Sequence, residues 1–327
     1  MKKLYAILGP TGSGKTNLLF QFLNQKEQKF EVINVDSRQV YKTIPIGTAI
    51  PSEEVIKKIP HHLINFLEPN KVFSAGEFKR KANQLIKEIY SRNHIPIFCG
   101  GSGFYFKAFS TKMLDIGEIR DEQKEEVRNY LSHLSIEQKR EMLLKIDPLS
   151  LTKKNEIMGR GRFHPNDEYR IQRSLELYFL TKKTLRMHYE ETMHEFQLEY
   201  KIIGIYLDLP FETLQKKLFL RSKEMVEQGI INEAMNLYLT YGDCNAMKTP
   251  GYREIIKLIF EKWKTLQISE NQKNEVKDKI QEILYNTHKK YAKAQIKWFK
   301  KEKSLKRLNE EETKKFLIQL ESLRDFE

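Results

Sequence analysis

Eight residues near the start of the chain have the types and the spacing of a phosphate-binding loop. They fit the pattern G-x-x-x-x-G-K-[ST] and are Gly9, Pro10, Thr11, Gly12, Ser13, Gly14, Lys15 and Thr16. Glycines let backbone N–H groups turn inward on an anion, and the dipole of a following helix adds to the attraction. The lysine brings a point charge to phosphate oxygens, and the Thr16 hydroxyl can bind Mg²⁺. The motif predicts a site for a diphosphate-bearing molecule with Mg²⁺ as cofactor.

The elements that must position this loop are visible on both sides of it. A short apolar run over residues 4–8 predicts a buried parallel strand before the loop, and apolar residues at helical spacing follow it. Further strands are expected over residues 31–35, 95–99 and 202–207, and a helix over residues 75–92. Strands that alternate with helices predict an α/β fold, a P-loop NTPase-like parallel sheet flanked by helices.

The long interval between the third and fourth expected strands differs from the rest of the chain. It has helical periodicity throughout and no convincing strand. We therefore expect residues 112–200 to form an all-helical insertion domain. Residues 1–111 and 201–327 should form the core domain, which ends in basic helices.

A carboxylate, Asp36, stands at the end of the second expected strand. ATPases commonly hold Mg²⁺ with an acid after a neighbouring strand, but the third strand here runs into Gly100 and Gly101 instead. Asp36 is placed to act as a general base or to contact the metal indirectly. The alternative is that Asp36 and Ser37 form an ordinary turn or helix cap.

The composition of the chain limits the classes of protein to which it can belong. The chain has 327 residues, of which 40% are hydrophobic, and 57 Lys+Arg against 44 Asp+Glu give a net charge of +13. This excess suits a polyanionic partner, although a generally basic proteome would also produce it. The two cysteines are far apart in sequence, which argues against a disulfide framework and a zinc site. Without a long apolar run, we expect a cytoplasmic protein with no membrane partner.

Several segments, taken together and in order, resemble the tRNA dimethylallyltransferases, also called tRNA isopentenyltransferases. They are the phosphate loop, DSRQVY at 36–41, GTAIP at 47–51, HHLI at 61–64, GGSGFY at 100–105, HPND at 164–167 and GYRE at 251–254. The resemblance spans roughly residues 4–299. It implies transfer of a dimethylallyl group from dimethylallyl diphosphate to N6 of the adenosine at tRNA position 37, next to the anticodon. The loop would then hold the diphosphate as a leaving group.

The resemblance also implies roles for single residues. Asp36 matches the family's general base, Arg221 matches an arginine at the donor diphosphate, and Ser102 and Thr48 match polar contacts near the reacting centre. The family usually has threonine where Ser102 stands. Without the resemblance, Arg221 would be taken for a solvated helix charge.

Two segments are candidates for contact with tRNA. Asp36, Ser37, Arg38, Gln39 and Ser102 would lie beside the adenine once it leaves its stack. The resemblance implies a second set, because a tRNA-contacting stretch of the family matches Tyr169, Arg170, Ile171, Gln172 and Arg173, with Arg128 as a weaker match. Arg170 and Arg173 should share a helix face without acidic partners, which suggests phosphate contacts, although an ordinary solvated face is the alternative.

A basic stretch over residues 288–307 adds a third candidate surface. Tyr291, Gln295 and Trp298 should fall on one helical face, where we expect the aromatic rings to dock on the core. The lysines of another face, Lys289, Lys293, Lys297 and Lys300, are the RNA candidates.

Some positions depart from the family pattern, and other functions stay open. The family tends to have Lys, Asp, Arg and Thr where this chain has Ile50, Asn65, Ala294 and Lys297. We interpret His61 and His62 as structural and expect a monomer. The alternatives are a small-molecule or nucleoside kinase, a nucleotide-gated RNA-binding module, and a transferase that prenylates free adenine nucleotides.

Overall fold

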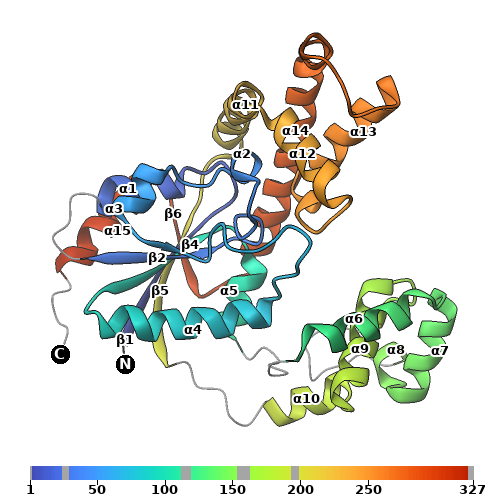
Figure 1. Ribbon diagram of the computed structural model, residues 1–327. Helices are drawn as coiled ribbons and strands as arrows, with labels where there is room; N and C mark the ends of the chain where they lie inside the picture. Colours follow the sequence, from blue (N-terminus) through green and yellow to red (C-terminus); the bar gives the residue numbers. More distant parts are fainter. Residues whose placement is uncertain (1, 24–28, 112–118, 153–162, 193–198, 323–327) are drawn as a thin grey trace. The chain divides into compact units, whose positions relative to one another are not determined.

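The computed structural model describes residues 2–23, 29–111, 119–152, 163–192 and 199–322 (Figure 1). The chain divides into two compact units. One comprises Met1–Ser110 together with Glu199–Glu327, and the other is Thr111–Leu198. The first contains the phosphate loop, and the second is built only of helices in its described part.

The first unit is organised around a parallel sheet of six strands. They are β1 (Lys2–Leu8), β2 (Phe30–Val35), β3 (His61–His62), β4 (Ile95–Gly100), β5 (Tyr200–Leu207) and β6 (Leu305–Leu308). Their order across the sheet is β3-β2-β4-β1-β5-β6, so that β4 lies between β1 and β2. The expected parallel α/β fold is confirmed. The carboxyl ends of β1, β4 and β2 therefore lie side by side, and the phosphate loop and Asp36 follow two of them.

Two of the strands were not expected from the sequence. β3 has only two residues, too few for a periodic pattern. β6 lies in the lysine-rich stretch that we expected to be helical, and that expectation is wrong for its last residues. Only Leu305 and Leu308 of β6 are buried, because this strand forms the edge of the sheet.

Helices cover both faces of the sheet (Figure 1). α1 (Lys15–Leu23) and α15 (Glu310–Ser322) cover one face, and α4 (Ala75–Ser91) and α5 (Gly103–Ser110) cover the other. α4 starts at a capping box formed by Ser74 and Glu77 and buries an apolar stripe that includes Phe78. The Phe78 ring stacks on that of Tyr105 in α5, with centroids 4.8 Å apart.

The remaining helices of this unit lie in two segments of the chain, one between β2 and β3 and the other between β5 and β6. They are α2 (Pro45–Thr48), α3 (Glu53–Lys58), α11 (Phe211–Glu227), α12 (Ile230–Tyr241), the 3₁₀ turn η2 (Ala246–Lys248), α13 (Tyr252–Trp263) and α14 (Glu270–Phe299). α14 is drawn orange to red in Figure 1 and packs against α11, α13 and α5. It thereby connects α11 and α13 with α5, which follows the carboxyl end of β4.

The second unit has its own small core. Its helices are α6 (Asp121–Ser132), α7 (Ile136–Ile146), α8 (Leu149–Thr152), α9 (Glu168–Thr181) and α10 (Leu185–Thr192). Leu131, Leu143, Ile171 and Leu175 form the buried centre, with Asp167 capping α9 through a bond to the Arg170 N–H. In either unit, none of the described helices is both long enough and apolar enough to cross a membrane.

Candidate active site

The phosphate loop occupies the turn between β1 and α1. Its first residue is tied to the neighbouring strand, because the Gly9 N–H donates to the Gly100 carbonyl at 3.1 Å. Gly12 and Gly14 have φ values of 76° and 86°, which residues with a side chain rarely adopt. α1 then begins at Lys15, so that its first N–H groups have no partner within the helix. This backbone can take a diphosphate in the manner the motif predicts.

Two buried cationic side chains, Lys15 and Arg221, lie near the phosphate loop. Burial lowers the pKa of the Lys15 ammonium; the charge of Asp36 opposes this shift, and that of Arg221 adds to it. Burial also lowers the pKa of the Arg221 guanidinium, against the effect of Asp36. The Arg221 Nε is buried and has no hydrogen-bond partner among the residues that the structure describes. Asp36 and Glu224 oppose the desolvation of Arg221 only in part, and a bound anion would complete the pairing of the two cations.

Asp36 is held at the end of β2 by its own turn. One carboxylate oxygen, Oδ1, accepts the Arg38 N–H at 2.7 Å and the Gln39 N–H at 3.3 Å. The turn that we weighed as an alternative is therefore real, and it fixes the carboxylate rather than removing it from the site. Asp36 lines a pocket together with Lys15 and Thr16.

The same pocket includes residues that the sequence did not single out for it. His61, Cys99 and Asn34 contribute to its wall. Thr16 Oγ1 lies 4.0 Å from the sulfur of Cys99, a buried thiol at the end of β4. The strand pairing explains their presence, because β2, β3 and β4 are neighbours in the sheet. No signal in the sequence joins these positions.

Ser102 and Thr48 flank the site in different ways. The Ser102 N–H donates to the carbonyl of Val35 at 2.9 Å, which places Ser102 beside Asp36. Thr48 is buried, and its hydroxyl donates to the Ile44 carbonyl at 2.7 Å. Because its proton is already engaged, Thr48 could meet a diphosphate as a donor only by giving up that bond. Its contact with the donor stays a prediction.

The three residues after Asp36 are each tied to a different element. Arg38 donates to the Asn245 carbonyl at 3.3 Å, and Gln39 donates to the carbonyls of Thr48 and Ala49 at 3.0 Å. Tyr291 of α14 lies close enough to Ser37, Arg38 and Asp36 for all three to influence its pKa. Burial raises the pKa of Tyr291, and the charge of Asp36 acts in the same direction. We expected Tyr291 only to dock its helix, and the structure brings it to the site as well.

The arginines of the second unit differ from the sequence-based expectation. Arg170 Nε lies 3.3 Å from Asp167 Oδ2, and Arg173 Nη1 lies 2.7 Å from Glu176 Oε2. The expectation that this face lacks acidic partners was therefore wrong. Arg128 also approaches Glu176, at 3.9 Å, so two of the predicted tRNA contacts gather around one buried carboxylate.

The other members of this segment divide by exposure. Tyr169 is 79% exposed, whereas Ile171 is fully buried in the core of the unit. The Ile171 side chain therefore supports the helix from within and presents no surface of its own. Gln172 donates to Glu176 and accepts from Lys139, so it also belongs to the polar network.

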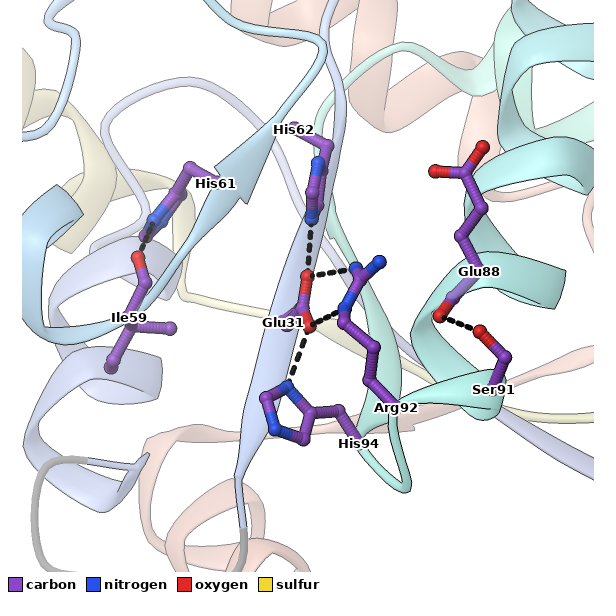
Figure 2. Close-up of polar contacts among 8 residues, drawn as sticks. All are labelled: Glu31, Ile59, His61, His62, Glu88, Ser91, Arg92 and His94. Carbon is purple, nitrogen blue, oxygen red and sulfur yellow. Dashed lines mark hydrogen bonds and ion pairs between the residues drawn. The ribbon is translucent and has the colours of Figure 1, made fainter.

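A second charged cluster lies at the opposite end of β2 from Asp36. Figure 2 shows Glu31 between His62, Arg92 and His94. His62 and His94 each lie 2.6 Å from a Glu31 oxygen, and Arg92 donates to both oxygens, at 3.2 and 2.9 Å. Burial alone would raise the pKa of Glu31, but the hydrogen bonds from Arg92, His62 and His94 lower it to about 2. The partners of His62 agree with its structural interpretation, whereas His61 lines the pocket.

The donor set fits Mg²⁺ better than a transition metal. Thr16 offers a hydroxyl and Asp36 a carboxylate to the same pocket, and Mg²⁺ prefers oxygen ligands of which substrate phosphates supply part. Across the described residues, no group of three or more His, Cys, Asp or Glu could hold a metal ion.

Comparison with known proteins decides the family. A family model described as IPP transferase matches residues 39–302, most of the chain. The chain belongs to the IPP transferase family. The matched range begins after the phosphate loop and Asp36. The match to the family model confirms the resemblance that the short motifs indicated.

Full-length relatives agree with the family assignment. The chain is 32% identical over 311 residues to the tRNA dimethylallyltransferase of Leptospira interrogans, covering 94% of this chain and 95% of the relative. It is 34% identical over 300 residues to the enzyme of the same description from Anoxybacillus flavithermus, covering 91% and 88%. The alternative of a small-molecule kinase is not favoured by these matches.

Solved structures of the family resemble the fold over nearly the whole chain. A tRNA isopentenylpyrophosphate transferase from Staphylococcus epidermidis aligns with a TM-score of 0.62 at 29% identity and covers 99% of this chain and 98% of its own. A eukaryotic dimethylallyltransferase described as acting on tRNA aligns with a TM-score of 0.73 at 26% identity. That alignment covers 99% of this chain and 78% of the eukaryotic one.

Proposed function

We propose that the chain transfers a dimethylallyl group from dimethylallyl diphosphate to N6 of the adenosine at tRNA position 37, giving N6-(dimethylallyl)adenosine. Family membership supports the reaction class. The observation that carries the residue-level proposal is the meeting of Lys15 and Arg221, both desolvated, with Asp36 beside the phosphate loop. This arrangement suits a reaction in which a diphosphate departs while a proton is removed nearby.

Asp36 is the general base of the proposed mechanism. The lone pair of the adenine amine is delocalised into the ring, so the amine attacks the allylic carbon only weakly by itself. As the N6–carbon bond forms and the carbon–oxygen bond to diphosphate breaks, the N6 proton passes to the Asp36 carboxylate. The turn bonds from Arg38 and Gln39 hold one oxygen and so aim the group. Ser102 is proposed to act near the same centre, and its N–H bond to Val35 at the end of β2 supports this.

The phosphate loop binds the diphosphate as it leaves. Negative charge grows on the oxygen that was bonded to the allylic carbon as that bond breaks, and fixed cations and N–H groups in a desolvated site stabilise such charge. Lys15, Arg221 and the amides of Gly12 to Thr16 supply them, with Thr48 as a further contact. Mg²⁺, held by the Thr16 hydroxyl, would neutralise part of the diphosphate charge. Gly9, Pro10 and Thr11 complete the loop.

The RNA side of the proposal involves both units. Ser37, Arg38 and Gln39 lie beside the adenine, while Tyr169, Arg170, Gln172, Arg173 and Arg128 contact the tRNA from the helical unit. The segment's Ile171 anchors that surface from within. Arg170 and Arg173 remain about half exposed despite their acidic partners, so their N–H groups can still reach phosphates. We further propose that the enzyme acts in the cytoplasm, as a monomer and without a membrane partner.

A product assay tests this proposal directly. The purified chain is given labelled dimethylallyl diphosphate with unmodified tRNA in one reaction and AMP in another. We expect label in tRNA, at N6 of one adenosine, and none in AMP. The matched control is Lys15→Ala, which should lose donor affinity while remaining folded. Label in AMP alone would indicate a transferase for free nucleotides, and phosphoryl transfer from ATP to a nucleoside would indicate a kinase.

A further inference from the structure

The side chain of Gln295 in α14 joins two loops of the candidate site. Its Oε1 accepts the Thr11 N–H at 2.8 Å, and its Nε2 donates to the Gly101 carbonyl at 2.9 Å. Gln295 is 6% exposed; its bond to Gly101 is buried, and its bond to Thr11 is partly buried. A carboxamide offers an acceptor and a donor at its two ends, and the contact uses both. Among side chains of this length, only glutamine meets both backbone groups in this way at neutral pH.

The junction that Gln295 closes has little free space. Gly9 is already bonded to Gly100, next to the Gly101 that Gln295 binds. A Cβ added to Gly101 would lie 2.5 Å from Gln295 Nε2 and 3.0 Å from the Gly9 carbonyl oxygen. The missing side chain at Gly101 is what lets the glutamine approach. The phosphate loop, the end of β4 and α14 therefore form one close contact.

The residues one turn to either side of Gln295 meet the other loops of the site. Tyr291 lies near Ser37 and Asp36, both of which influence its pKa. Trp298 covers Gly103, where any Cβ would collide with its indole ring. Positions 291, 295 and 298 share one face of the helix. A single helix face thus touches the loops after β1, β2 and β4.

We propose that Gln295 is a positioning residue for the donor diphosphate, an inference that rests on the proposed function. It takes up the Thr11 N–H and holds the loop against Gly101. The amides from Gly12 onward and the Lys15 ammonium then keep the arrangement that the diphosphate needs. Without Gln295, the buried Gly101 carbonyl and the partly buried Thr11 N–H lose their partner, and the loop relaxes away from β4. Donor binding should suffer before proton removal does, because Asp36 is held by its own turn.

Two substitutions separate this role from simple packing. Gln295→Met keeps the volume but can neither accept nor donate as the amide does. We expect it to weaken binding of magnesium pyrophosphate, measured by calorimetry, and to raise the donor KM by about tenfold, with a much smaller change in kcat. Gln295→Glu keeps the acceptor, but when ionised it cannot donate to Gly101 and adds a negative charge beside the diphosphate. Its affinity for pyrophosphate should fall further at neutral pH.

The pH dependence of the glutamate variant is the sharper readout. A protonated carboxyl regains a donor, so the ratio of its pyrophosphate affinity to that of the wild type should move toward one as pH falls. Gln281→Met, a substitution of the same type earlier in α14, is the matched control and should bind pyrophosphate like the wild type. If Gln295→Met does not fold, the pH profile of Gln295→Glu decides the matter alone.

The outcomes distinguish this inference from the proposed function. If both Gln295 variants bind pyrophosphate within about twofold of the wild type while losing thermal stability, Gln295 serves packing only and the inference is overturned. If the wild type binds pyrophosphate but modifies no tRNA, the proposed function fails, and the pyrophosphate measurements still test Gln295.

Discussion

Two carboxylates at opposite ends of one strand have opposite surroundings. Glu31, near the start of β2, accepts bonds from one arginine and two histidines and is 3% exposed. Asp36, just past the end of β2, receives only backbone N–H groups from its own turn among the bonds recorded for the described residues. The cations near it, Lys15 and Arg221, are desolvated.

The difference shows how structural charge is distinguished from functional charge in this fold. A carboxylate whose charge is fully paired stabilises the strand and has little capacity left for a ligand. A carboxylate that faces incompletely paired cations marks a place where the protein holds charge for something else. Both acids lie at the ends of the same strand, so secondary structure alone does not separate their roles. Their partners do.

The largest effect is expected from removing the carboxylate of Asp36. Asp36→Asn keeps an acceptor for the turn but removes the base, so transfer to tRNA should slow by about 10²–10⁴-fold. Pyrophosphate binding and melting temperature should stay near those of the wild type. Single-turnover rates with labelled donor measure the change. Asp208→Asn is the control, because Asp208 also follows a parallel strand but is paired with Arg307. Unimpaired turnover in Asp36→Asn would remove this residue from the mechanism.

The cations offer the next contrast. Arg221→Leu should weaken pyrophosphate binding by about 10- to 100-fold, because a charge-assisted contact with the diphosphate is lost. Its stability should be unchanged or higher, since a buried guanidinium without a full set of partners is removed. Arg92→Leu should do the reverse, lowering stability and leaving pyrophosphate binding alone. Calorimetry and thermal melts on the two variants test the pair. Equal effects of the two on binding would contradict the assignment of Arg221.

Acid titration sharpens the comparison at Glu31. The pKa of Glu31 is about 2 in the folded chain, below its ordinary value of 4.5. Its contribution to stability is therefore fully present above about pH 4.5 and is lost as pH falls toward about 2. Glu31→Gln should lower the free energy of unfolding at pH 7 by about 3 kcal/mol and flatten the pH dependence in that interval.

Chemical denaturation at several pH values measures this effect. Glu54→Gln is the control, because Glu54 is an exposed carboxylate paired with Lys58 and should change stability little. Transfer activity of Glu31→Gln at neutral pH should match the wild type while the protein is folded. If the Glu31→Gln variant stays stable but loses activity, Glu31 takes part in the active site, contrary to this prediction.

The smallest effect concerns the helical unit, where paired arginines are proposed to meet RNA. Arg170→Gln with Arg173→Gln should reduce the slope of log affinity for tRNA against log salt by about one to two. Because both arginines already have acidic partners, we expect the lower end of that range. Lys145→Gln with Lys183→Gln removes two paired cations from the same unit and is the control. An unaltered slope in the arginine variant would place the RNA surface elsewhere.

Much of the site was predictable because its requirements are local. The loop over residues 9–16 needs glycine at left-handed positions and a lysine at the start of a helix, and both are visible in the order of residues. Asp36 was predictable from its place at a strand end. The pairing of Arg170 and Arg173 was also accessible, since Asp167 and Glu176 lie three residues away on the same helix face. Our sequence-based prediction overlooked that spacing.

What the sequence by itself determined is the set of features that depend on neighbours in the chain: the buried strands, the phosphate loop, the caps of the helices and the family. Only the tertiary structure decided which distant groups meet. Gln295 lies 284 residues from Thr11, and β6 pairs with β5 at the sheet edge. The physical reason is that a hydrogen bond depends on distance and direction in space, and for groups far apart in sequence only the packing of helices on the sheet sets them.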